Sequence, residues 1–171
     1  MKREATYSST IGNFLAKYAI FIVTIVLFIA LSVMSSGFLT SQNLVNILRQ
    51  QSFVGMIAVG MTFVIITGGI DLSVGAILAF SGMCTAIFCV TDANGATVLP
   101  LGVAVMIGIA VSVLIGCGNG LLVAKGKVAP FIATLGMQTI LRGAALLLND
   151  GRPVINLSNE FKEIGGGSII G

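Results

Sequence analysis

Among the few residues of this sequence that could take part in chemistry, Asp71 has the most distinctive setting. It follows Gly68 and Gly69 and stands just before a long apolar run. Two glycines interrupt a helix, and an aspartate can accept hydrogen bonds from the free N–H groups where the next helix starts. We therefore predict a helix break at residues 68–71 that Asp71 caps. The alternative is a carboxylate that binds a ligand or a coupled ion at a broken helix.

A second polar group lies within the apolar run at 128–148. Thr134, Gln138 and Arg142 stand four residues apart, so they form a stripe along one side of a helix. Such a stripe can line a hydrophilic translocation path or can hydrogen-bond neighbouring helices, and Arg142 is near enough to the end to reach water. We take these three residues as candidates for a path, with bonding between helices as the alternative.

The sequence offers little for catalysis or metal binding. It contains no histidine, which is the commonest general base and metal ligand. Its cysteines, Cys84, Cys89 and Cys117, all lie in apolar runs and form no C-x-x-C pair. We expect no catalytic residue, no metal site, no disulfide and no cofactor.

The glycine-rich stretch at 120–128 does not match a nucleotide-binding loop. Five residues separate Gly120 from Gly126, where the P-loop has four, and Val128 follows the lysine in place of serine or threonine. No hydroxyl is therefore available there for Mg²⁺. The sequence contains no recognisable ATPase site.

The composition indicates that most of the chain lies in a membrane. Hydrophobic residues make up 56% of the chain and charged residues only 9%, with a mean hydropathy of +1.07. A soluble domain carries about 25% charged residues. The excess apolar surface must face lipid. The net charge of +3 comes from residues scattered at the ends of apolar runs, which does not suggest nucleic-acid binding.

The apolar runs predict an all-α fold, a polytopic transmembrane helical bundle of about five spans that forms a single membrane domain over residues 1–171. The predicted spans are residues 18–34, 53–67, 72–90, 98–124 and 128–148. The first is too long for the apolar part of a typical signal peptide, and further spans follow it, so we expect an uncleaved first helix.

Two segments allow more than one interpretation. The polar interlude at 37–51 suits a short helix in the membrane interface or an extension of the next span. The run at 53–67 is short for a full crossing, and a re-entrant segment there would invert everything that follows.

Small residues recur at every fourth position of the run at 98–124. In lipid, such a seam lets another backbone approach closely, because van der Waals packing replaces the hydrophobic effect as the driving force. We predict a helix-packing seam formed by Ala104, Gly108, Ser112, Gly116 and Gly120.

Short loops rich in lysine and arginine favour the cytoplasmic side of a membrane. We therefore place the N-terminal tail, residues 1–17 with Lys2, Arg3 and Lys17, in the cytoplasm. After four crossings the basic turn at 125–127 is also cytoplasmic. After five, residues 149–171 form an extracytoplasmic segment.

Residues 60–75, which contain the break, resemble the signature of the ribose/xylose/galactose-type monosaccharide ABC permeases. Residues 118–136, and Arg142-Gly143 followed by 149–153, agree with that family in order and spacing, as does the opening at 38–44. The resemblance covers nearly the whole chain after about residue 18. Members of that family are longer, so the chain resembles their N-terminal half.

The resemblance implies a multi-pass permease subunit of the bacterial inner (plasma) membrane that moves a ribose-like monosaccharide by alternating access. The partners it implies are a cytoplasmic ATP-binding subunit, which would hydrolyse ATP, a periplasmic sugar-binding protein and a second permease copy in a homodimer, beside membrane lipid. The alternatives are a subunit of a secondary carrier or channel that works without ATP, and an inert truncated membrane fragment in which the break and the polar stripe serve only packing.

Overall fold

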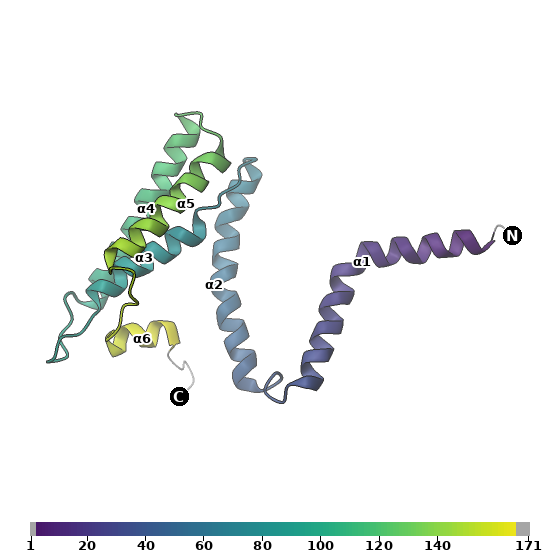
Figure 1. Cartoon of the computed structure of the whole chain (residues 1–171), viewed down its shortest axis with the longest axis horizontal. Helices are drawn as coiled ribbons and strands as arrows, with labels where there is room; N and C mark the ends of the chain where they lie inside the picture. The colour runs from purple at the N-terminus through teal and green to yellow at the C-terminus, as the bar shows by residue number, and fades with distance from the viewer. Residues whose placement is uncertain (1–2, 167–171) are drawn as a thin grey trace. The chain divides into compact units, whose positions relative to one another are not determined.

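The computed structural model describes residues 3–166, and within that range all regular structure is helical apart from two isolated β-bridges (Figure 1). The helices are α1 (Arg3–Met34), α2 (Ser41–Ile66), α3 (Val74–Phe88), α4 (Leu101–Ala124), α5 (Pro130–Leu148) and α6 (Asn159–Gly166). The predicted all-α fold is confirmed.

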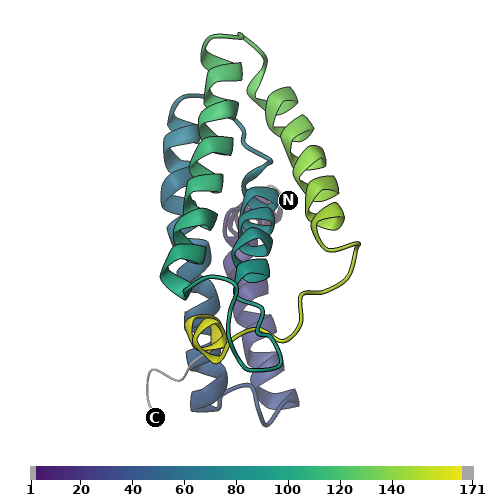
Figure 2. The same cartoon turned by 90° about the vertical axis from the view of Figure 1, so that its left-hand side faces the viewer.

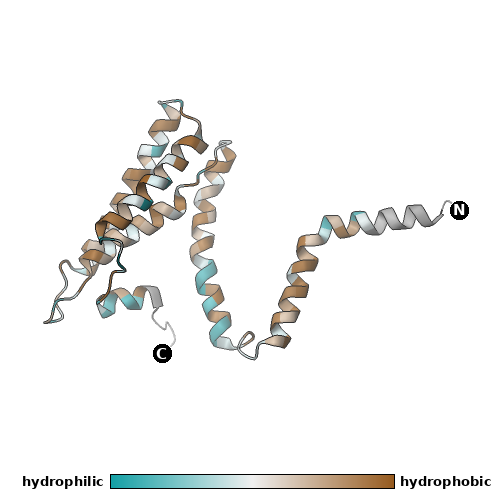
Figure 3. Cartoon of the chain, in the orientation of Figure 1, coloured by the Kyte–Doolittle hydropathy of each residue, from teal (hydrophilic) through white to brown (hydrophobic). Residues whose placement is uncertain are grey.

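In the part of the chain that the structure describes, four helices are long and apolar enough to cross a membrane: Gly12–Met34 within α1, and α2, α4 and α5. Hydrophobic residues predominate along these helices (Figure 3). Many of their large apolar side chains are exposed, as expected of surfaces that meet lipid. The helix of the third predicted span is shorter. α3 has 15 residues, so it is about 22 Å long at 1.5 Å per residue, less than the ~30 Å of a hydrocarbon core.

The chain divides into two compact units, Met1–Met56 and Ile57–Gly171. The first unit contains α1 and the start of α2, where polar residues are concentrated in the first turns (Figure 3). Asn43 donates from its Nδ2 to Phe38 O at 2.7 Å. Residues 41–51 form the first part of α2 and continue without a break into its apolar part. From residue 41 on, the polar interlude is therefore an extension of the next span.

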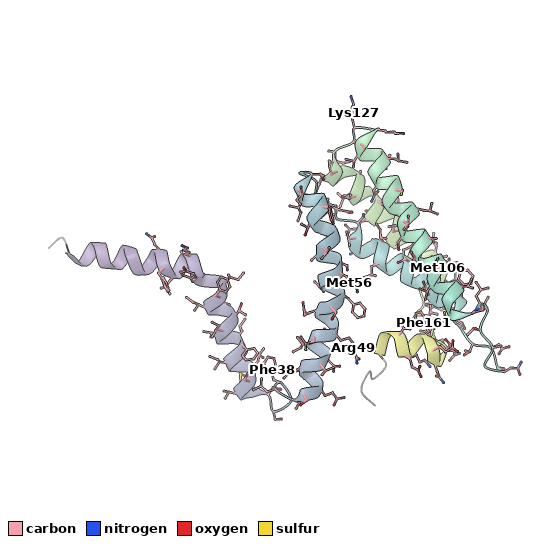
Figure 4. All side chains as sticks on the ribbon, turned by 180° about the vertical axis from the view of Figure 1, so that it is seen from behind. Phe38, Arg49, Met56, Met106, Lys127 and Phe161 are labelled. Carbon is pink, nitrogen blue, oxygen red and sulfur yellow. The ribbon has the colours of Figure 1, made fainter. Side chains whose placement is uncertain are left out.

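In the second unit α3 packs against both α4 and α5, and α4 packs against α5 (Figures 1 and 2). The buried side chains at these contacts are mostly small, as at Ala76, Ala104 and Ala133. Small residues allow close approach of helix backbones, which stabilises helix pairs in lipid. The turn between α4 and α5 carries Lys127, which projects away from the helices (Figure 4).

At the other end of this unit, the loop after α3 is tied to the segment after α5. Ser158 N donates to Cys89 O at 2.9 Å, and Thr91 N donates to Asn156 O at 2.9 Å. Phe161 N then donates to Ser158 Oγ at 3.2 Å at the start of α6. The predicted extracytoplasmic segment is thus joined to the chain after α3 at Asn156 and Ser158, while its residues 167–171 lie outside the described range.

Candidate functional site

The predicted helix break lies between α2 and α3, with residues 67–73 outside both helices. Gly68 has a φ of 76°, a conformation that glycine adopts without steric cost. Its N–H donates to Ile65 O at 2.9 Å, and Gly69 N donates to Val64 O at 3.0 Å, so the last turn of α2 is closed. A Cβ on Gly69 would lie 3.2 Å from Val64 Cγ1 and 3.7 Å from Pro130 Cβ, so a side chain there would crowd the passage of the chain beside α5.

The Asp71 carboxylate is held by the residue that precedes α3. Its Oδ1 accepts from Ser73 N at 2.7 Å and from Ser73 Oγ at 2.6 Å. Ser73 occupies the N-cap position of α3, and its own side chain makes no capping hydrogen bond. Asp71 therefore forms a turn just before the helix, close to the positive end of the helix dipole. The alternative role of Asp71, binding a ligand or an ion, stays a prediction.

Asn119 of α4 extends this arrangement into the buried interior of the unit. Its Nδ2 donates to Ser73 Oγ at 2.9 Å, and the two side chains are 6% and 0% exposed. Because Ser73 gives its single hydroxyl proton to the carboxylate, its oxygen can only accept from Asn119, which fixes the orientation of the amide. Asn119 Oδ1 is buried without a hydrogen-bond partner in the part of the chain that the structure describes.

Thr134 of α5 supports the same broken segment from the other side. Its Oγ1 accepts from Leu72 N at 3.2 Å, donates to Pro130 O at 2.8 Å, and lies 3.3 Å from Ile70 O. The side chain is 4% exposed. Non-helical backbone at membrane depth must find partners within the protein, and Thr134 supplies one.

The three residues of the polar stripe do not share one environment. Thr134 is buried, Gln138 is half-buried, and Arg142 is exposed. A spacing of four residues advances about 40° around a helix at each step, because one turn takes 3.6 residues. The stripe therefore winds outward along α5, and only Thr134 touches the break.

The five residues of the seam separate in the same way. Ala104 and Gly108 are buried and Ser112 is half-buried, whereas Gly116 and Gly120 are exposed. A Cβ on Gly108 would overlap Thr85 Oγ1 and lie 3.1 Å from Ser81 O, whereas nothing lies within 4 Å of a Cβ placed on Gly116. α3 and α4 are therefore in close contact at Gly108.

Sequence reasoning did not single out Asn119 or Ser73. Their hydrogen bond joins residues 46 positions apart, so no local spacing reveals it. The available signal was chemical: an amide within the apolar sequence of α4 needs a partner when it is buried.

The α3–α4 loop at the other end of the unit is organised by Asp92. Its Oδ1 accepts from Ala96 N at 2.8 Å and from Asn94 N at 2.9 Å. These backbone N–H groups, that of Ala96 above all, stabilise the charged carboxylate and lower the pKa of Asp92. Asp92 lines a polar hollow together with Glu160 and Lys162.

These features define a multi-pass helical membrane protein: long apolar helices, polar residues buried between them, and a helix break between α2 and α3. Residues 43–168 match a family described as "Branched-chain amino acid transport system / permease component". The chain belongs to this permease family, as the resemblance of its motifs predicted.

Several curated relatives cover most of the chain. It is similar to the ribose import permease protein RbsC of Haemophilus influenzae, with 39% identity over 100% of the chain and 52% of the relative. The corresponding protein of Bacillus subtilis is 42% identical over 88% of the chain and 46% of its own length. The D-allose transport system permease protein AlsC of Escherichia coli is 40% identical over 88% of the chain and 45% of its own length.

The chain thus spans about half the length of the curated relatives that it matches. The comparison with solved structures gave no significant match.

Proposed function

We propose that this chain is the N-terminal part of the membrane-spanning permease subunit of an ATP-driven importer, and that it translocates a ribose-like monosaccharide across the bacterial inner membrane by alternating access. The observation that supports the proposal is the similarity to the ribose import permeases of Haemophilus influenzae and Bacillus subtilis, which extends over 100% and 88% of the chain. The break and the residues that hold it lie inside the matched region, residues 43–168.

The geometry of the break suits a conformational mechanism. Three side chains, Ser73, Asn119 and Thr134, join the broken segment to α4 and α5 through a few hydrogen bonds. Each such bond contributes about 0.5–1.5 kcal/mol net. Their loss and re-formation therefore lie within the energy that a partner can supply to a two-state change.

The proposal includes three partners. A separate subunit binds and hydrolyses ATP, consistent with the absence of a P-loop from the sequence. A soluble sugar-binding protein meets the polar hollow around Asp92, Glu160 and Lys162, which offers side chains of both signs. A second copy of the permease completes the membrane part.

Affinity purification from bacterial membranes, joined to a sugar-uptake assay, tests this function. We expect the chain to recover an ATP-binding subunit and a sugar-binding protein, and labelled ribose uptake to require ATP. Uptake that continues without ATP but collapses with the ion gradient would indicate a secondary carrier. Recovery of no partner, with no uptake, would indicate an inert fragment.

A pair of variants connects the assay to the break. Ser73→Ala removes the hydroxyl between Asn119 and Asp71 and is expected to lower uptake. Gly116→Ala, at an exposed and uncrowded position of α4, is the control and is expected to leave uptake unchanged. Equal uptake by both variants would refute a role for the break.

The proposed orientation places the N-terminus and the turn that contains Lys125 in the cytoplasm, and the loop that contains Asn94 outside. Single cysteines at these two positions, in a background without Cys84, Cys89 and Cys117, should react with an impermeant maleimide from opposite sides. Labelling of position 125 only from outside would reverse the orientation.

A further inference from the structure

A groove of about 410 Å³ runs between α3 and α5 in the second unit. Its size falls within the range of about 300–1,000 Å³ that is usual for ligand sites. Apolar residues of both helices line it, together with two arginines and the turn after α5. The residues that matter here are Ala76, Ala79, Met83, Leu141, Arg142 and Arg152.

The two arginines come together because the chain turns back after α5. Gly151 has a φ of 69°, its N–H donates to Leu146 O at 2.7 Å, and Arg152 N donates to Asn149 O at 2.8 Å. Arg142 lies six residues before the end of α5, which is about 9 Å along the helix. Arg142 and Arg152 therefore both line the groove.

These guanidinium groups have unused binding capacity. Among residues 12–164, whose side chains the structure describes, Arg142 and Arg152 have no side-chain hydrogen bond or ion pair. Asp150 is the nearest acid along the chain and does not line the groove. An arginine presents several N–H donors in a planar fork that suits phosphate, so the part of the groove that Arg142 and Arg152 line favours an anion.

The apolar residues that line the groove favour an alkyl chain as the rest of the ligand. Alanine, leucine and methionine offer no hydrogen bond to the hydroxyl groups of a sugar, whereas they suit an alkyl chain. From Ala76 to Met83 the groove follows α3 for seven residues, or about 10 Å. This length accommodates the upper part of an acyl chain that descends into the bilayer from a headgroup at the helix end.

We propose that this groove binds an anionic phospholipid, with its phosphate on Arg142 and Arg152 and one acyl chain between α3 and α5. The site lies in the leaflet that meets the end of the unit where the α3–α4 loop lies. The proposal does not rest on sugar transport, since it concerns only the chemistry of these two helices and the following turn.

Native mass spectrometry of the purified, delipidated chain measures this binding directly. Phosphatidylglycerol is the probe, phosphatidylcholine is the zwitterionic comparison, and inorganic phosphate is the competitor. We expect a preference for phosphatidylglycerol that falls roughly tenfold or more in the double variant Arg142→Gln/Arg152→Gln, since each basic group near a membrane surface contributes several-fold to binding of anionic lipid. Lys125→Gln/Lys127→Gln removes the same charge at the opposite end of α4 and α5 and should keep the preference.

Two further variants separate this site from a loss of folding and from general charge attraction. Arg142→Lys/Arg152→Lys keeps the charge and should keep most of the preference. Ala79→Leu fills the groove and should weaken binding of the lipid, whereas Ala110→Leu on the exposed surface of α4 should not.

The proposal is overturned if the two double Gln variants bind phosphatidylglycerol equally, or if Ala79→Leu binds as the wild type does. Displacement of the lipid by inorganic phosphate at equal concentration would also overturn it, because the acyl chain would then contribute nothing.

Discussion

Gly108→Ala tests the packing of α3 on α4 at a tight contact between the two helices. The added methyl group would overlap Thr85 Oγ1. The Thr85 hydroxyl is held in place, since it donates to Ser81 O at 2.9 Å. The methyl group can therefore be accommodated only if Thr85 changes rotamer or the helices move apart.

The expected cost follows from three contributions. Overpacking of a tight contact costs about 1–3 kcal/mol, and loss of the Thr85 hydrogen bond costs about 1 kcal/mol. Alanine in a helix recovers about 0.5–1 kcal/mol relative to glycine. We expect Gly108→Ala to lower the free energy of unfolding by about 1–3 kcal/mol.

Gly116→Ala is the matched control, because it makes the same change on the same helix where nothing lies within 4 Å of the new Cβ. Its free energy of unfolding should equal or exceed that of the wild type by up to about 1 kcal/mol. The assay is unfolding of the purified chain in mixed micelles by increasing dodecyl sulfate, followed by helical circular dichroism.

A double variant tests whether contact with Thr85 causes the loss of stability in Gly108→Ala. Thr85→Ala removes the atom that the methyl group of Gly108→Ala would strike, so the two changes together should cost less than their sum, by about 1 kcal/mol or more. Equal stability of Gly108→Ala and Gly116→Ala, or strict additivity with Thr85→Ala, would refute the proposed contact.

Three further outcomes are expected. Ser73→Ala removes the acceptor of the Asn119 amide and should lower the free energy of unfolding by about 1–3 kcal/mol in the same assay, since a buried donor is left unpaired. Thr134→Val should cost a similar amount, because the N–H of Leu72 loses its partner, whereas Thr134→Ser keeps the hydroxyl and should be close to wild type. The pKa of Asp92 is below its ordinary value of 3.8, so the charged carboxylate favours the folded loop above that pH, and this contribution is lost as pH falls through the lower folded pKa. NMR titration of the Asp92 carboxyl carbon measures this pKa in the folded protein.

Each of these outcomes has a control in the chain. Thr139→Val removes an exposed hydroxyl of α5 that bonds only its own helix, so it should cost little compared with the change at Thr134. Ser52→Ala is the corresponding control on α2. Asp92→Asn should abolish the loss of loop stability at low pH. If the loss persisted in this variant, another titrating group would be its cause.

The sequence predicts the helices well because hydropathy reports directly on lipid exposure. Long apolar runs give α1, α4 and α5, and the pair Gly68-Gly69 before Asp71 gives the break between α2 and α3. The short length of α3 could not be predicted, since residues 72–73 are as compatible with a helix as those that follow. Their position just before the helix depends on hydrogen bonds with side chains of α4 and α5.

The two predictions of polar and small-residue stripes show the limit of a spacing argument. A repeat of four residues looks like one face of a helix over two turns, but it rotates away over four. Thr134 and Gly108 lie at contacts, whereas Arg142 and Gly120 have turned outward. Burial in α4 instead follows a spacing close to 3.6 residues, from Ala104 and Gly108 on to Asn119.

The bond from Leu72 N to Thr134 Oγ1 also sets an order of events during synthesis. The acceptor lies 62 residues after the donor, so the stretch before α3 leaves the ribosome long before α5 exists. Until α5 arrives, the polar backbone of this stretch has no such partner and would be costly to place in hydrocarbon. Stable insertion of α3 must therefore wait for the helices translated after it, so a ribosome stalled before α5 should leave α3 accessible to water.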